Sequence, residues 1–158
     1  MLIISVILIL ILSLLIIEKR MLQKSISSMS LRIHVNGTRG KSSVTEYIAA
    51  GIASSRPEVM AKITGIIPST IHNGVMQVVD RRGPARVQEQ VHILMSAFRK
   101  GVKTMVMECM SIAPELQKVE GSIFKPHLYV ITNIRDDHRE VMGEDPEAQA
   151  EAICSAIP

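Results

Sequence analysis

The chain has 158 residues, which leaves room for one compact domain and a short extra segment but excludes two full domains. Its formal net charge of +3 comes from scattered lysines and arginines, and it has only two Phe, two Tyr and no Trp. Nucleic-acid binding needs clustered basic charge or aromatic side chains that stack on bases, so nucleic acid is not an expected partner. The two cysteines, Cys109 and Cys154, form no CxxC motif, and we expect both to be reduced thiols.

The N-terminus is the most apolar part of the chain. Residues 2–17 (LIISVILILILSLLII) carry no charge, and a helix of this length rises about 24 Å. This is slightly short of the hydrocarbon core of a bilayer, a gap that the residues on either side can fill. A signal peptide would have basic residues before the run and a small-residue cleavage site after it. A core helix that is apolar on every face is the other alternative.

Basic residues come after the apolar run and none comes before it. They are Lys19, Arg20, Lys24 and Arg32. Because lysine and arginine are concentrated on the cytoplasmic side of membrane spans, this bias predicts the orientation. We predict a single-pass anchor over residues 1–20 in the cell membrane, with the following domain facing the cytoplasm. Residues 21–30, which are polar and serine-rich, are interpreted as a tether or as a continuation of the helix out of the membrane.

The remaining residues, 31–158, predict an α/β domain. Residues 31–36 alternate as a short strand, and residues 42–54 have helical apolar spacing. The later segments are an interrupted apolar run over 59–67, an exposed extended piece over 75–80, an amphipathic helix over 85–100, buried strands over 103–108 and 127–132, and a helix from Pro146. Strands that alternate with helices imply a mainly parallel sheet flanked by helices, with a ligand site at the carboxyl ends of the strands.

A glycine loop, Gly37-Thr38-Arg39-Gly40-Lys41-Ser42, joins the first strand to the first helix of this domain. Backbone N–H groups of such a loop face an anion, and the helix dipole adds to the attraction. Lys41 is suited to the β- and γ-phosphates of ATP, and the Ser42 hydroxyl is suited to Mg²⁺. The general pattern G-x-x-x-x-G-K-[ST] fails at Val35, where its first glycine would be. This pattern alone allows two interpretations: a P-loop that binds ATP, and a glycine turn with a surface lysine.

Four pieces of the sequence together resemble the Mur-type ATP-dependent amide ligases, whose phosphate loop has the form GTxGK[ST]. The pieces are HVNGTRGKSSVT (34–45), KITG (62–65) followed by Ile67-Pro68, MECM (107–110), and TNI (132–134) followed by Asp137-His138. Within this family the wording is most similar to the capsule-forming ligases that polymerise glutamate, which also begin with an apolar segment. The resemblance covers residues 31–145.

The resemblance implies a reaction in which ATP phosphorylates a carboxylate, an amine attacks the acyl phosphate, and an amide forms with release of ADP and phosphate. It implies catalytic roles for Lys41, Glu108 and His138, and Mg²⁺ ligation by Ser42, Glu108 and His138. The residues expected to contact ATP are Asn36, Gly37, Thr38, Arg39, Gly40, Lys41, Ser42 and Ser43. Expected substrate contacts, with weaker support, are Thr64, Asn133 and Arg135. By residue type alone, Glu108 is a metal ligand or a solvated strand-end acid, and His138 is a surface residue.

The sequence departs from the family in two respects. No lysine follows Lys125, whereas many members have a carbamylated lysine shortly after the Asp-His pair. Because the sequence ends at Pro158, we also expect this chain to lack the C-terminal domain that, in the family, closes over the nucleotide and binds the amine. Two interpretations are open, a truncated product and a fragment completed by a second chain that supplies that domain. The other expected partners are the subunits of a membrane synthase complex, glutamate and growing poly-γ-glutamate. The alternatives are another Mur-type ligase, acting on cell-wall peptides or folylpolyglutamate, and a non-catalytic ATP-binding scaffold.

Overall fold

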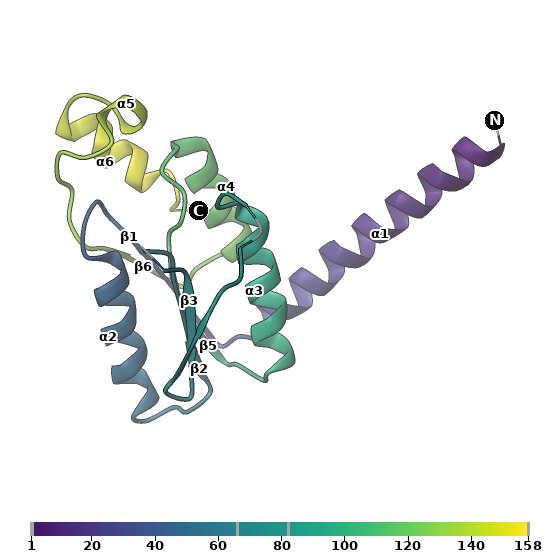
Figure 1. Ribbon diagram of the computed structural model, residues 1–158, viewed down its shortest axis with the longest axis horizontal. Coiled ribbons are helices and arrows are strands. Elements are labelled where there is room, and N and C mark those ends of the chain that lie inside the picture. Colours follow the sequence, from purple (N-terminus) through teal and green to yellow (C-terminus); the bar gives the residue numbers. More distant parts are fainter. Residues whose placement is uncertain (1, 66, 82, 158) are drawn as a thin grey trace.

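The computed structural model describes residues 2–65, 67–81 and 83–157. Its centre is a six-stranded sheet in the order β4-β3-β2-β5-β1-β6 (Figure 1). The strands are β1 (Leu31–Asn36), β2 (Val59–Ile63), β3 (Ser69–His72), β4 (Val75–Val78), β5 (Thr104–Glu108) and β6 (Leu128–Ile131). β2, β5, β1 and β6 are mutually parallel, while β3 and β4 add an antiparallel hairpin at one edge.

Helices cover both faces of this sheet. They are α1 (Leu2–Ser27), α2 (Lys41–Ala53), α3 (Val87–Arg99), α4 (Pro114–Phe124), α5 (Arg139–Met142) and α6 (Pro146–Cys154). Figure 1 shows α2 on one side of the sheet and α3 and α4 on the other. The mixed α/β architecture, with a mostly parallel sheet flanked by helices and preceded by an apolar helix, agrees with the prediction from sequence.

Alternation along the strands produces a separate core on each face. Val35 and Val106 belong to the cluster under α2, whereas Met105 and Met107 belong to the cluster under α3 and α4. Every residue of β5 is buried, since this strand lies in the middle of the sheet and both its faces are covered. Glu108 follows the same alternation and lies on the α2 face.

Two parts of the domain were missed by the sequence prediction. The apolar run 59–67 was expected as one segment, but β2 ends at Ile63 and the chain returns as β3, which pairs with β2. The stretch between the strands predicted over 103–108 and 127–132, for which no element was predicted, forms α4, with Pro114 in its first turn where a helix needs no N–H donor. The helices predicted over 42–54 and 85–100 are confirmed as α2 and α3, within two residues at each end.

Among the described residues, one helix is long and apolar enough to cross a membrane, and it is α1. Figure 1 shows its N-terminal part projecting away from the domain, and the large apolar side chains there are exposed. The helix continues without interruption to Ser27. Residues 21–27 therefore continue the helix, which agrees with the second of the two interpretations of residues 21–30, and residues 28–30 lead from α1 into β1.

The C-terminal end of α1 is part of the domain core. Ile26 and Met29 are buried in the cluster that contains Leu94 and Met105, and Leu22 packs against it. On the surface, Gln88 donates a hydrogen bond to Glu18 over 3.0 Å. These contacts fix the direction in which α1 leaves the domain, because the buried and exposed parts belong to one helix.

Candidate functional site

The loop between β1 and α2 lies at the carboxyl edge of the parallel strands, where ligands of α/β sheets usually bind. Gly37 and Gly40 have φ angles of 129° and 78°, values that favour glycine. Gly40 is the N-cap of α2 and no side chain caps this helix. The first N–H groups of α2 are therefore left for a ligand or solvent. The Lys41 ammonium folds back and donates to the Gly37 carbonyl over 2.7 Å.

The Glu108 side chain connects three of the predicted motifs through direct contacts. It is 3% exposed at the end of β5. Its Oε2 accepts a hydrogen bond from the Ser42 hydroxyl over 2.9 Å and another from the Thr64 backbone N–H over 2.6 Å. Gly65 leaves the space in front of Ser42 free, since a Cβ there would stand 2.9 Å from the serine oxygen. The structure thus joins the loop, KITG and MECM motifs at one carboxylate.

The segment after β6 forms several hydrogen bonds with the glycine loop. Asn133 accepts from the Thr38 hydroxyl through Oδ1 over 2.7 Å and donates to the Arg39 carbonyl over 2.9 Å. The Thr132 hydroxyl also donates to the Arg39 carbonyl, and the backbone N–H of Arg135 donates to Thr38. Asn133 and Arg135, predicted as substrate contacts, therefore lie against the phosphate-loop candidate.

His138 is placed differently from the other residues predicted to bind metal. Its imidazole is 42% exposed, and its ion-pair partners in the described part of the chain are Asp137 and Glu140, at 3.9 and 3.7 Å. Neither Ser42 nor Glu108 is among them. The backbone of His138 has a positive φ of 52°, which puts this residue at a sharp turn before α5. Of the three residues predicted to bind Mg²⁺, Ser42 and Glu108 thus contact each other, and the described structure shows no contact of His138 with either.

Asn36 directs its side-chain amide nitrogen away from the loop. Its amide donates to Gln117, to the Tyr129 hydroxyl and to the Ile153 carbonyl, while its Oδ1 accepts from the Gly37 N–H. The side chain, predicted to contact ATP, is 1% exposed and lies on the α4 side of the sheet. This arrangement favours a role in positioning Gly37 over direct contact with a nucleotide. Ser43, also predicted to contact ATP, is exposed in the first turn of α2.

Two groups of polar residues beside this site were not predicted from sequence. Buried Lys62 on β2 pairs with Glu89 on α3 over 2.8 Å, and Arg81 pairs with the same carboxylate over 2.5 Å. Burial lowers the pKa of Lys62, while the Glu89 carboxylate opposes this shift. A lysine inside an apolar strand is the sequence signal for such a pair, because an unpaired buried ammonium is very costly.

The second unpredicted group lies on α4. Glu120 accepts from the backbone N–H groups of Met110 and Ser111, over 3.0 and 3.1 Å, and from Gln90 over 2.6 Å. Burial raises its pKa, but the neighbouring His34 imidazole and the hydrogen bonds from the Met110 N–H and Gln90 outweigh burial and lower the pKa to about 2. No sequence signal marked Glu120, since α4 itself was missed. It holds the residues that directly follow Glu108.

Comparison with known proteins identifies the class to which this fold and site belong. Residues 35–154 match the Mur ligase middle domain, so the chain belongs to the Mur ligase family, as the motifs predicted. It is 31% identical over 146 residues to the capsule biosynthesis protein CapB of Bacillus anthracis, and 31% identical over 148 residues to the PGA synthase CapB of Bacillus subtilis (strain 168). The predicted similarity to capsule-forming ligases is thereby confirmed.

The alignments cover a larger share of this chain than of its relatives. The two CapB alignments cover 89% and 90% of this chain but 31% and 37% of the relatives, so the chain spans about a third of their length. A UDP-N-acetylmuramoyl-L-alanyl-D-glutamate–2,6-diaminopimelate ligase of Alkalilimnicola ehrlichii is 28% identical over 114 residues, which are 71% of this chain and 21% of that ligase. All three alignments therefore cover most of this chain but only part of the longer relative.

Proposed function

We propose that this chain supplies the ATP and Mg²⁺ site of a membrane-bound, ADP-forming amide ligase that makes poly-γ-glutamate. The observation that carries the proposal is the meeting of Ser42 and Glu108 at the uncapped N-terminus of α2. Membership of the Mur ligase family and the similarity to two CapB proteins support the reaction class. Glutamate as the substrate is suggested by the name of the PGA synthase among these relatives.

The loop has the features needed to receive phosphates. Gly40 at the N-cap exposes the first N–H groups of α2 to the loop, where the helix dipole favours an anion. The Lys41 ammonium already lies over the loop at the Gly37 carbonyl. When phosphates occupy the loop, we expect Lys41 to exchange this carbonyl for a phosphate oxygen and to neutralise part of the charge that develops there.

The oxygen pair at the loop fits a hard divalent cation. Mg²⁺ takes oxygen ligands and is usually bound by one or two carboxylates together with substrate phosphates. Ser42 and Glu108 provide a hydroxyl and a buried carboxylate that already touch each other. A bound Mg²⁺ would neutralise phosphate charge during transfer. Glu108 stays oriented by the Thr64 N–H, and a role for His138 remains a prediction.

In this proposal the chain positions the reactants and does not form a covalent bond with them. The phosphate loop holds ATP, the γ-phosphoryl group passes to a glutamate carboxylate, and an incoming amine displaces phosphate to form the amide. Asn133 and Arg135 lie beside the loop, where they would contact phosphate or the carboxylate. The groups that bind the amine are expected on a further part of the enzyme or on a partner chain.

We also propose that α1 anchors this site at the cytoplasmic face of the membrane, with other synthase subunits as partners. The apolar residues of α1 are exposed over its N-terminal two thirds, and length and composition suit a span. Those two properties are shared with signal sequences, so the basic residues after Ile17 are the feature that favours a retained, inward-facing anchor.

ATP binding by the full chain in detergent micelles tests the nucleotide site. We expect calorimetry to show Mg²⁺-dependent binding of a non-hydrolysable ATP analogue, and Lys41→Ala to weaken it at least tenfold. Lys118→Ala removes an exposed lysine on α4 and serves as the matched control, with unchanged affinity. Equal affinity in wild type and Lys41→Ala would contradict the site.

Turnover distinguishes the ligase from the alternatives. In the membrane complex that contains this chain, we expect glutamate-dependent ADP release that is lost in Lys41→Ala and strongly reduced in Glu108→Gln. If ATP binds but no tested amino acid causes ADP release, the result would favour the non-catalytic ATP-binding scaffold. Release that depends on a UDP-linked peptide, and not on glutamate, would instead place the chain with the cell-wall ligases.

A further inference from the structure

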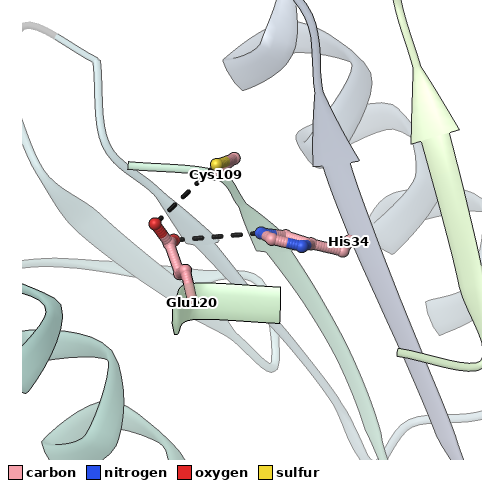
Figure 2. Close-up of side chains that lie close together, drawn as sticks. All are labelled: His34, Cys109 and Glu120. Atoms are coloured by element: carbon pink, nitrogen blue, oxygen red, sulfur yellow. Dashed lines mark hydrogen bonds and ion pairs between the residues drawn. The ribbon is translucent and has the colours of Figure 1, made fainter. Parts of the chain in front are cut away.

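Three side chains that can bind metal meet on the sheet face opposite the phosphate loop. They are His34 on β1, Cys109 at the end of β5 and Glu120 on α4, and Figure 2 shows the carboxylate of Glu120 directed toward both of the others. One ligand atom from each residue can be chosen so that the three atoms lie within 4.8 Å of one another. The relative exposures of the three residues are 0%, 1% and 1%. None of the three is used in the proposed ligase reaction.

The separations suit a shared ion. His34 Nε2 lies 3.8 Å from Glu120 Oε1, and Cys109 Sγ lies 3.7 Å from Glu120 Oε2. Ligands bound to zinc at about 2.0 to 2.3 Å in a tetrahedron stand roughly 3.3 to 3.8 Å apart. The two distances run to different oxygens of Glu120. The imidazole separation is too long for a hydrogen bond and the thiol separation is that of a weak S–H hydrogen bond, while both are close to the spacing of ligands around a tetrahedral ion.

His34 provides an independent observation. Both of its ring nitrogens are buried without a hydrogen-bond partner in the described structure. The ring is held edge-on between Phe124 and Tyr129, at centroid distances of 5.5 and 5.4 Å, so it cannot easily turn toward another partner. A buried polar atom without a partner costs about 1 to 3 kcal/mol, and a metal ion would satisfy one of these nitrogens.

Glu120 has the outer contacts that a metal-binding carboxylate needs. Gln90 and the backbone N–H groups of Met110 and Ser111 hold its two oxygens in place. Such contacts orient ligands before the ion arrives. A divalent cation would also balance the charges of the carboxylate and a thiolate, which are otherwise costly in a buried position.

We propose that His34, Cys109 and Glu120 bind a Zn²⁺ ion through imidazole nitrogen, thiolate sulfur and carboxylate oxygen. Sulfur and imidazole ligands favour zinc over the magnesium expected at the oxygen ligands Ser42 and Glu108. Binding transfers the Cys109 thiol proton to solvent, and a water fills the fourth position. The ion would tie β1, β5 and α4 together directly behind Glu108. This site does not depend on the proposed ligase activity.

Cobalt substitution tests the site without changing the core. The chain has two cysteines, so in Cys154→Ser any thiolate ligand must be Cys109. We expect the full-length Cys154→Ser chain in detergent micelles, after treatment with a chelator, to develop a sulfur-to-cobalt charge-transfer absorption. It should saturate at one Co²⁺ per chain and be displaced by Zn²⁺ but not by excess Mg²⁺. Cobalt at Ser42 and Glu108 would not produce this absorption.

Variants of the ligands provide the second arm. Cys109→Ser, with Cys154 intact, should lose the absorption, and His34→Gln and Glu120→Gln should weaken Co²⁺ binding at least tenfold. Far-UV circular dichroism identifies any variant that fails to fold. The Cys154→Ser result decides the question in that case: no thiolate absorption at micromolar Co²⁺, or Zn²⁺ unable to displace it, overturns the proposal.

Discussion

Gly37 is the residue at which the phosphate-loop candidate comes closest to the end of β6. Its φ is 129°, and a Cβ at this position would stand 2.8 Å from the Asn133 carbonyl oxygen and even closer to the Thr132 hydroxyl. Backbone atoms cannot move aside as a flexible side chain can. The requirement for glycine therefore has two sources at once, the backbone conformation and the space beside it.

We predict that Gly37→Ala lowers the free energy of unfolding by at least about 1 to 3 kcal/mol, the usual cost of a strained backbone. It should also reduce ATP affinity. Gly51→Ala is the matched control, because Gly51 lies within α2 with no atom within 4 Å of an added Cβ. Alanine there should stabilise the chain by about 0.5 to 1 kcal/mol. Urea denaturation in micelles measures both, and similar effects of the two changes would contradict this account.

The Lys62–Glu89 pair makes a second prediction at the residue scale. Lys62 is fully buried, and removing its partner leaves an uncompensated ammonium. Glu89→Gln should destabilise by about 3 to 5 kcal/mol. Lys62→Met in the same chain should recover most of this loss, because a flexible apolar side chain then fills the position. A double-mutant cycle by urea denaturation measures the coupling, and strictly additive effects would show that the pair is not coupled.

Glu89 also gives stability a pH dependence of known sign. Burial raises its pKa, but the hydrogen bonds from Arg81 and Lys62 outweigh burial, so the folded pKa lies below the ordinary 4.5. The unfolded chain therefore binds this proton at higher pH than the folded chain does. The stabilisation is present above about pH 4.5 and declines as pH falls through the folded pKa. Equilibrium unfolding between pH 6 and 3 should show a smaller decline in Glu89→Gln.

At the scale of elements, α1 combines two environments along one helix. Leu8, in the N-terminal third of the helix, is 54% exposed, while Ile26 is 8% exposed in the core with Met29 and Leu94. The same apolar residue types are thus exposed at the N-terminal end of α1 and packed into the domain core at its C-terminal end. This explains why the boundary between anchor and domain could not be read from hydrophobicity alone.

We predict that Ile26→Ala destabilises the domain by about 2 to 5 kcal/mol, as large-to-small changes in a core do. Leu8→Ala is the control and should change the unfolding midpoint of the domain little. Thermal unfolding in micelles, followed by circular dichroism, compares the two. If Ile26→Ala behaves like Leu8→Ala, the end of α1 is not part of the folding unit.

At the scale of the whole molecule, the proposed orientation makes a labelling prediction. Cys154 on α6 is exposed and Cys109 is buried, so Cys154 reports the side of the membrane on which the domain lies. A membrane-impermeant maleimide should label inverted membrane vesicles and leave intact spheroplasts unlabelled. Cys154→Ser should abolish the signal. Labelling of intact spheroplasts would place the domain outside the cell.

The local features of the fold were predictable because they depend on neighbouring residues. Helix α3 follows from apolar spacing, and the strand-loop-helix unit around Gly37 to Ser42 follows from β-branched residues, glycines and helical spacing in succession. The extended piece predicted over 75–80 is confirmed as β4, but β3 and its pairing with β4 were missed since β3 has only four residues and most of them are polar. Helix α4 was missed since its apolar residues are interrupted by Gln117, Glu120 and Gly121.

By itself the sequence determined the α/β class, the apolar N-terminal helix, the phosphate-loop candidate and the membership of the Mur ligase family, because each depends on local periodicity or on motif wording. Only the tertiary structure decided that Glu108 contacts Ser42 and the Thr64 N–H, that the ion-pair partners of His138 in the described residues are Asp137 and Glu140, and that His34, Cys109 and Glu120 meet. Parallel strands bring their carboxyl ends together from distant positions in the chain. Which side chains then face one another is set by strand order and register, which a single sequence does not reveal.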